Sequence, residues 1–170
     1  MHLSLRARFG LVALAAFGLT AAGLLIGEVM NLQPCPLCIF QRLLYLLIGC
    51  LAVVGALVPS WGRLWAALLG LTAVGGLATA GYQSWLQYLP TASMECGFGE
   101  PTLIEQIVDW FGVLWPAVFM ATGFCSSKDW MFLGLSMANW SCLCFLAFAI
   151  VAGSMLAKSR PPLVFVPRSR

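Results

Sequence analysis

The chain has 170 residues, of which 61% are hydrophobic and only 9% are charged. A soluble domain carries about 25% charged residues, so this composition indicates a protein that lies in a lipid bilayer. The net charge of +3 is too small, and too confined to the chain ends, to indicate nucleic-acid binding. The length suits one integral membrane domain covering 1–170.

Four apolar stretches are long enough to cross a membrane. A helix needs about 20 such residues to span the hydrocarbon layer, and the stretches cover 9–27, 39–58, 64–85 and 140–157. None has the alternating pattern of a membrane β-barrel, and helices satisfy their backbone hydrogen bonds internally. We therefore expect an all-α membrane protein with a four-transmembrane-helix bundle. The proline-containing tail, 158–170, is predicted to be disordered.

The first stretch has two interpretations. It follows Arg6 and Arg8, as the apolar core of a cleaved signal peptide would. Signal cores usually have about 7–15 apolar residues. The longer run in this chain favours an uncleaved membrane anchor.

Charge separates the two sides of the predicted bundle. All the acidic residues fall in the two loops on one side, together with Arg42 and Lys128. The termini and the turn between the second and third spans carry only basic residues: Arg6, Arg8, Arg63, Lys158, Arg160, Arg168 and Arg170. Because cytoplasmic loops are enriched in Lys and Arg, both termini are predicted to be cytoplasmic.

The cysteines sort by compartment. Four fall in the two outer loops, where disulfides persist: Cys35, Cys38, Cys96 and Cys125. The other three fall within predicted helices and are interpreted as small apolar residues: Cys50, Cys142 and Cys144.

Cys35 and Cys38 form a Cys-x-x-Cys motif, which is typical of a redox pair, half of a zinc site or a structural disulfide. Pro34 and Pro36 mark the start of the second helix, so the two thiols are expected to share one helix face. Arg42 lies one turn beyond Cys38. A cation and a helix N-terminus both favour a thiolate, although Arg42 could instead extend to the lipid headgroups.

Cys96 and Cys125 flank a predicted amphipathic helix in the second outer loop. Thr102 and Glu105 have the spacing of a capping box, and Pro116 is expected to end or kink the helix. As a purely structural disulfide, this cysteine pair would contribute roughly 3–4 kcal/mol. A zinc site is less favoured because zinc fingers usually supply a second close pair of ligands. We therefore expect no metal.

Together these motifs resemble the disulfide bond formation protein B (DsbB) family. The resemblance covers roughly 29–152, in the right order and with four spans. The segment 130–140 also looks like the family's approach to its fourth helix. The matching features are Pro34-Cys35-Pro36-Leu37-Cys38, then Gln41-Arg42, then Cys96 and Cys125, and they are specific as a set.

The resemblance implies an inner-membrane thiol:quinone oxidoreductase. Such a protein reoxidises a periplasmic DsbA-like thioredoxin-fold protein and passes the electrons to a membrane quinone, ubiquinone or menaquinone, which supports disulfide bond formation. Cys35 and Cys38 would form the quinone-linked pair, with Cys38 next to the quinone. Arg42 would help to hold the quinone and stabilise charge on Cys38. Cys96 and Cys125 would oxidise the partner. Cys96 would form the mixed disulfide, and Cys125 would pair transiently with Cys35.

The chain departs from the family pattern at Gln41, where the best-studied members have an acidic residue. Glu28 is an alternative acid partner for Arg42. Three other classes remain open. An enzyme of the vitamin K epoxide reductase type has the two cysteine pairs in reverse order, a metal transporter would use the cysteines within the spans, and a structural four-span protein would need only a loop disulfide.

Overall fold

The computed structural model describes residues 4–88, 102–128 and 130–158. Its four long helices are α1 (Leu5–Val29), α2 (Pro36–Leu57), α3 (Gly62–Leu86) and α6 (Met137–Lys158). A short 3₁₀ turn, Pro59–Trp61, joins α2 to α3. The shorter elements are α4 (Leu103–Leu114), α5 (Pro116–Phe119), β1 (Met131–Phe132) and β2 (Leu135–Ser136).

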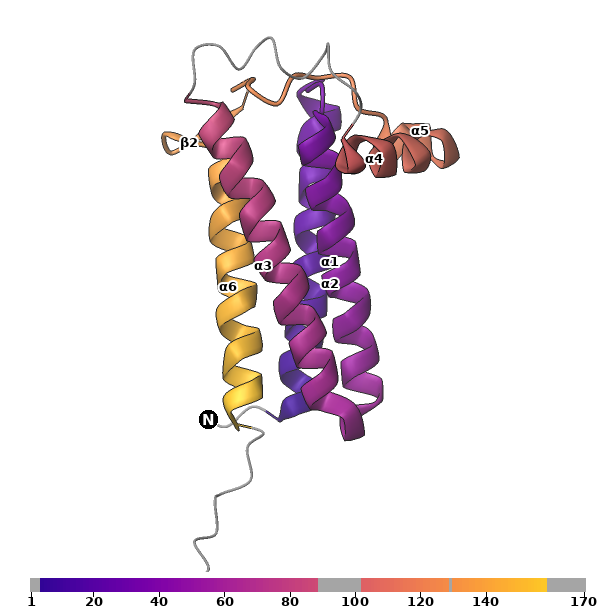
Figure 1. The fold of residues 1–170 in the computed structure, drawn as a ribbon, viewed down its shortest axis with the longest axis vertical. Coiled ribbons are helices and arrows are strands. Elements are labelled where there is room, and N and C mark those ends of the chain that lie inside the picture. The colour runs from indigo at the N-terminus through magenta and orange to yellow at the C-terminus, as the bar shows by residue number, and fades with distance from the viewer. Residues whose placement is uncertain (1–3, 89–101, 129, 159–170) are drawn as a thin grey trace, which may run out of the picture.

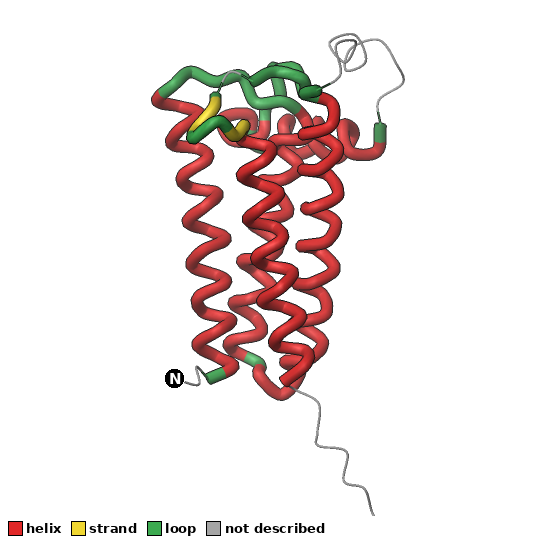
Figure 2. Tube along the Cα trace, turned by 90° about the vertical axis from the view of Figure 1, so that its left-hand side faces the viewer, coloured by secondary structure: helices red, strands yellow, loops and turns green. Residues whose placement is uncertain are grey.

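The four long helices run side by side as a bundle (Figure 1). The closest pairs are α3 with α6 and α1 with α2, and α2 also packs against α3. The turn from α2 to α3 lies at one end of the bundle. The start of α2, the end of α3, the hairpin of β1 and β2, and α4 and α5 all lie at the other end (Figures 1 and 2). We call this second end the cysteine end, because Cys35, Cys38 and Cys125 lie there.

The surface of the bundle is that of a membrane protein. All four long helices have the length and composition needed to cross a bilayer. Large apolar side chains point outward from each of them, including Leu14, Leu47, Leu71 and Ile150. A helix that is apolar on all sides is stable in lipid, whereas a surface of this kind would associate in water. The predicted four-helix membrane bundle is therefore confirmed.

The helix starts follow local capping chemistry. Ser4 caps α1 by accepting a hydrogen bond from the N–H of Ala7. The predicted capping box of α4 is present, with Thr102 and Glu105 bonded reciprocally. Pro116 is the first residue of α5, just after the end of α4, as expected for a residue that cannot donate the backbone hydrogen bond needed to continue a helix. The assignment of 1–170 to one domain remains a prediction, and the tail beyond residue 158 lies outside the described residues.

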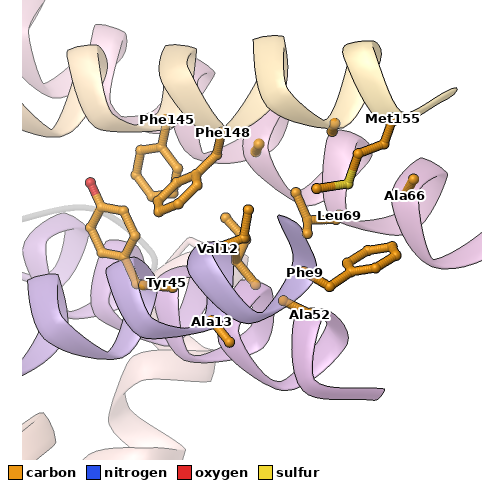
Figure 3. Close-up of a cluster of buried hydrophobic side chains, with 14 of the residues drawn as sticks. Phe9, Val12, Ala13, Tyr45, Ala52, Ala66, Leu69, Phe145, Phe148 and Met155 are labelled. Atoms are coloured by element: carbon orange, nitrogen blue, oxygen red, sulfur yellow. The ribbon is translucent and has the colours of Figure 1, made fainter. Parts of the chain in front are cut away.

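Aromatic rings and small residues form the core between the helices (Figure 3). Tyr45 of α2 stacks on Phe145 of α6, with ring centroids 4.3 Å apart. Phe145 also lies against Gly76 of α3, where an added Cβ would overlap the ring. Small residues let membrane helices approach closely, so Gly76 is what allows α3 and α6 to pack around this ring.

A β-hairpin just before α6 was not predicted from the sequence. β1 and β2 pair antiparallel, and the turn places Leu133 at φ 52° and Gly134 at φ 79°. Positive φ at both central residues is the geometry of a tight type I′ hairpin turn. The indole of Trp140 donates to the carbonyl of Phe132 at 3.1 Å and ties the hairpin to the first turn of α6. The hairpin thereby covers part of the cysteine end.

Candidate active site

Cys35 and Cys38 lie together at the start of α2. Cys35 is the N-cap residue, and its Sγ accepts a hydrogen bond from the backbone N–H of Cys38 at 3.3 Å. Its thiol donates to Sγ of Cys38 at 2.8 Å. Pro36 is tolerated in the first turn because that N–H would have no partner within the helix. The two sulfurs are thus adjacent at a helix N-terminus, which favours a thiolate.

Cys125 lies beside this pair although it is distant in sequence. Cys35 and Cys125 are each 2% exposed, and they form a buried cluster with Leu37 and Leu86 against which Cys38 packs. Hydrogen bonding with Cys125, hydrogen bonding with Cys38 and burial together raise the pKa of the Cys35 thiol above its ordinary value. Cys35 is therefore held as a thiol within reach of two sulfur partners.

Backbone hydrogen bonds hold the segment that carries Cys125 against the residues before α2. The N–H groups of Thr122 and Gly123 both donate to the carbonyl of Pro34 at 3.0 Å. The hydroxyl of Thr122 also donates to the side-chain oxygen of Gln33. Because Pro34 immediately precedes Cys35, these bonds set the distance between the two cysteine-bearing segments.

Gln87, just beyond α3, ties the same segment down from the other side. Its Nε2 donates to the carbonyl of Ser127 at 3.0 Å, and its Oε1 accepts from the hydroxyl of Ser136 at 2.6 Å. Cys125 is therefore fixed between the start of α2 and the end of α3. This role of Gln87 was not predicted from the sequence. An amide side chain at the end of an apolar span was the signal that could have suggested it.

Two buried glutamines, whose contacts were also not predicted from the sequence, link α2 to α3 beside the sulfurs. Nε2 of Gln83 in α3 donates to Sγ of Cys38 at 3.0 Å and to Sγ of Cys35 at 3.3 Å. Oε1 of Gln83 accepts from Nε2 of Gln41 in α2 at 2.7 Å. Gln41, where the chain lacks the acidic residue of the best-studied family members, thus pairs with another amide. Buried polar groups inside a membrane protein are costly and often functional, which was the available signal.

Arg42 lies one turn beyond Cys38 on α2, and both side chains line two cavities at this end of the bundle. Its Nη1 donates to the backbone carbonyl of Val118 in α5 at 3.3 Å. No ion pair joins it to Glu28 or to another carboxylate among the described residues. Arg42 therefore keeps its positive charge near the thiols while its hydrogen bond goes to a neutral carbonyl.

Two cavities meet at Cys38, Arg42 and Gln83. The first has a volume of about 560 Å³, open mouth included, and extends past Cys35 to Phe124. The second, about 870 Å³ on the same basis, lies between α1, α2 and α6. The apolar part of the second cavity is lined by Leu19, Ala22, Gly23, Ile26, Trp130, Met137, Ala138 and Trp140. A largely apolar cavity with the Cys38 and Cys144 thiols and one guanidinium in its wall suits a flat, largely apolar molecule with polar oxygens.

Of the remaining cysteines, Cys144 also lines the second cavity. Cys96 falls outside the described residues, so its place relative to the site stays a prediction. Cys50 is exposed on α2, and Cys142 and Cys144 are half-buried on α6. Within 4–88, 102–128 and 130–158, no group of three His, Cys, Asp or Glu side chains is arranged to hold a metal ion.

A cluster of cysteines at one end of a four-helix membrane bundle defines a class, that of membrane thiol–disulfide oxidoreductases. Comparison with known proteins identifies the family within this class. The sequence model described as "Disulfide bond formation protein DsbB" matches residues 5–155, so the chain belongs to the DsbB family. It is thus a multi-pass membrane protein of disulfide bond formation.

Several relatives named "Disulfide bond formation protein B" are similar over most of their length. The one from Dechloromonas aromatica (strain RCB) is 48% identical over 149 residues, which is 86% of this chain and 90% of the relative. The one from Polaromonas sp. (strain JS666 / ATCC BAA-500) is 41% identical over 83% of this chain and 84% of the relative. The one from Azoarcus sp. (strain BH72) is 40% identical over 79% of this chain and 81% of the relative. The predicted family is therefore confirmed.

Proposed function

We propose that this protein is an inner-membrane thiol:quinone oxidoreductase that reoxidises a periplasmic DsbA-like thioredoxin-fold protein. The electrons would pass to a membrane quinone, ubiquinone or menaquinone. The observation that carries the proposal is the position of Cys38, which lies against Cys35 and also lines the cavity between α1, α2 and α6. A single sulfur thus connects a dithiol pair with a site for an apolar acceptor.

The charge distribution supports an orientation with both termini in the cytoplasm. The end of the bundle opposite the cysteine end carries Arg6, Arg8 and Arg63, and basic residues are enriched on the cytoplasmic side. The cysteine end would then face the periplasm. Disulfides persist in that compartment, and a soluble partner can reach the cysteines there.

The first step is thiol–disulfide exchange with the partner. A thiolate of the partner attacks the Cys96–Cys125 bond at Cys96, which forms a mixed disulfide and releases Cys125 as a thiolate. The second thiolate of the partner displaces Cys96, so the partner leaves oxidised by two electrons and Cys96 and Cys125 are left reduced. This assignment of Cys96 rests on the family resemblance.

The second step transfers the two electrons between the loops. The Cys125 thiolate attacks Sγ of Cys35, which breaks the Cys35–Cys38 bond and releases Cys38 as a thiolate. Cys96 then displaces Cys35 from Cys125, which restores the Cys96–Cys125 bond and leaves Cys35 and Cys38 reduced. The common buried cluster of Cys35 and Cys125 supports this step, because exchange needs direct approach of the sulfurs.

The residues around the second cavity fit a quinone. When bound, a quinone supplies an acceptor for two electrons. Cys38 presents its sulfur in the cavity wall, and Arg42 places positive charge at the same wall, which favours negative charge on the sulfur and on a ligand oxygen. The apolar lining from α1 and α6 excludes water and matches the apolar character of the ligand.

The proposal is tested with the purified protein in detergent. A reduced thioredoxin-fold protein of the DsbA type and a water-soluble ubiquinone analogue are added, and quinol is followed by absorbance. The protein should form quinol catalytically, and Cys38→Ser should abolish this activity. Cys50→Ser, an exposed thiol on the same helix, serves as the matched control and should retain full activity. Full turnover by Cys38→Ser would refute the proposal.

A second experiment addresses orientation. Single-cysteine variants at Ser4 and Phe124 are treated in intact cells with a maleimide that cannot cross the inner membrane. The proposed topology predicts labelling of the Phe124 variant but not of the Ser4 variant. The reverse pattern would place the cysteine end in the cytoplasm and contradict the periplasmic assignment.

A further inference from the structure

Gln41 and Gln83 form a buried amide pair inside the bundle. They are 4% and 3% exposed, and Nε2 of Gln41 donates to Oε1 of Gln83 at 2.7 Å. Burying an amide is costly unless its polar atoms are hydrogen-bonded. The pair joins α2 to α3 one turn beyond the Cys35–Cys38 motif.

This pairing orients the amide of Gln83. Its oxygen is occupied by Gln41, so its NH₂ group faces the other way, with Nε2 at 3.0 Å from Cys38 Sγ and 3.3 Å from Cys35 Sγ. A thiolate can only accept hydrogen bonds, whereas an amide NH₂ offers two donors. The donor capacity of Gln83 is therefore directed at the two sulfurs.

We propose that Gln83 is a further catalytic residue that stabilises the Cys38 thiolate, and that Gln41 is the positioning residue that aims it. This inference rests on the proposed function of Cys35 and Cys38 as a redox pair. Arg42 acts on this sulfur through its charge, whereas its hydrogen bond goes to the carbonyl of Val118. Gln83 is the side chain whose N–H groups contact both reacting atoms.

The chemical consequence is a bias of the redox pair toward its reduced form. Reduction of the Cys35–Cys38 bond takes up two electrons and two protons and leaves two thiols; loss of one proton from Cys38 then leaves one thiol and one thiolate. An N–H bond to an ionised sulfur is stronger than one to a neutral disulfide, and low-dielectric surroundings strengthen it further. Gln83 should therefore make the pair a stronger oxidant of Cys125.

The test needs neither quinone nor protein partner. Reduced protein in detergent is treated with iodoacetamide from about pH 5 to about pH 9, a range that covers activated thiols, and alkylation of Cys38 is measured by mass spectrometry. In parallel, the Cys35–Cys38 pair is equilibrated with glutathione. In that exchange two glutathione thiols reduce one protein disulfide and become one glutathione disulfide.

The variants are Gln83→Met, Gln41→Met and the matched control Thr79→Val, which removes a hydroxyl about one turn earlier on α3. Gln83→Met should shift Cys38 alkylation to higher pH and move the glutathione equilibrium about tenfold toward the disulfide, which corresponds to about 30 mV. Gln41→Met should produce a smaller shift in the same direction, because Gln83 keeps its donors but loses its orientation. Thr79→Val should leave both readouts at the values of the parent protein.

Parent-like profiles in Gln83→Met would overturn the inference. If that variant does not fold, the double variant Gln41→Met/Gln83→Met replaces both amides with apolar groups and is judged by the same two readouts. Parent-like alkylation profiles and glutathione equilibria in the double variant, or in Gln41→Met, would equally contradict the inference. If the parent protein does not reduce quinone while the variants still show these shifts, the proposed function is contradicted and the role of Gln83 stands.

Discussion

The guanidinium of Arg42 donates from Nη1 to the backbone carbonyl of Val118, 3.3 Å away, and so joins α2 to α5. The last carbonyls of a helix have no partner within it, and a cation near them is favourable. Arg42 thus anchors the segment of α4 and α5 while lining the cavity at Cys38. This explains how the arginine is held without an acid partner among the described residues.

Replacing Arg42 with Met should weaken quinone use. A hydrogen bond to a charged group contributes roughly 1.5–3 kcal/mol, so the KM for a quinone analogue should rise roughly ten- to a hundredfold. Steady-state quinol formation measures this effect. Arg63→Met, at the opposite end of the bundle, is the control and should not change KM. An unchanged KM in Arg42→Met would remove Arg42 from the quinone site.

Gln87→Leu should slow exchange between Cys125 and Cys35. The substitution removes the hydrogen bonds to Ser127 and Ser136 that fix the Cys125 segment. In a Cys38→Ser/Cys96→Ala background, diamide should form the Cys35–Cys125 disulfide, which peptide mapping detects. Ser154→Ala, which removes a hydroxyl far away on α6, is the control. If Gln87→Leu forms this disulfide at the parent rate, the amide does not position Cys125.

The reduced protein should lose stability at alkaline pH because of Cys35. Its pKa lies above the ordinary value of 9.0. Above pH 9.0 the unfolded chain therefore releases this proton while the folded protein keeps it. The folded state then binds more protons, so the free energy of unfolding falls as pH rises. Thermal unfolding from about pH 8 to about pH 10 should show a steeper loss for the parent than for Cys35→Ala, and equal slopes would contradict the assignment.

Gly76→Val should destabilise the packing of α3 on α6. A side chain at this position overlaps the ring of Phe145, which is fully buried and stacked on Tyr45 and so cannot move away. Overpacking of this kind costs about 1–3 kcal/mol, measurable by denaturation in mixed micelles. Gly75→Val is the matched control, because a Cβ there meets no atom within 4 Å. Equal losses in both variants would show that helix propensity, not the ring, sets the cost.

Local patterns in the sequence predicted the main elements. The four spans follow from length and apolarity, and α4 follows from the capping box of Thr102 and Glu105, whose chemistry lies within one turn. The adjacency of Cys35 and Cys38 also follows from spacing on one helix. The hairpin before α6 was not predicted, because its turn places Leu133, which is not a typical turn residue, at positive φ.

The sequence by itself determined that the chain lies in a membrane, and it determined which thiols and charges share a side. Only the tertiary structure decided the surroundings of each sulfur. Gln83 reaches Cys38 from α3, and Cys125 reaches Cys35 from a segment far along the chain. Such contacts depend on how each helix is rotated about its axis, and a helix that is apolar on all sides carries no strong signal for that rotation. Close packing at small residues and hydrogen bonds between buried polar groups specify it instead.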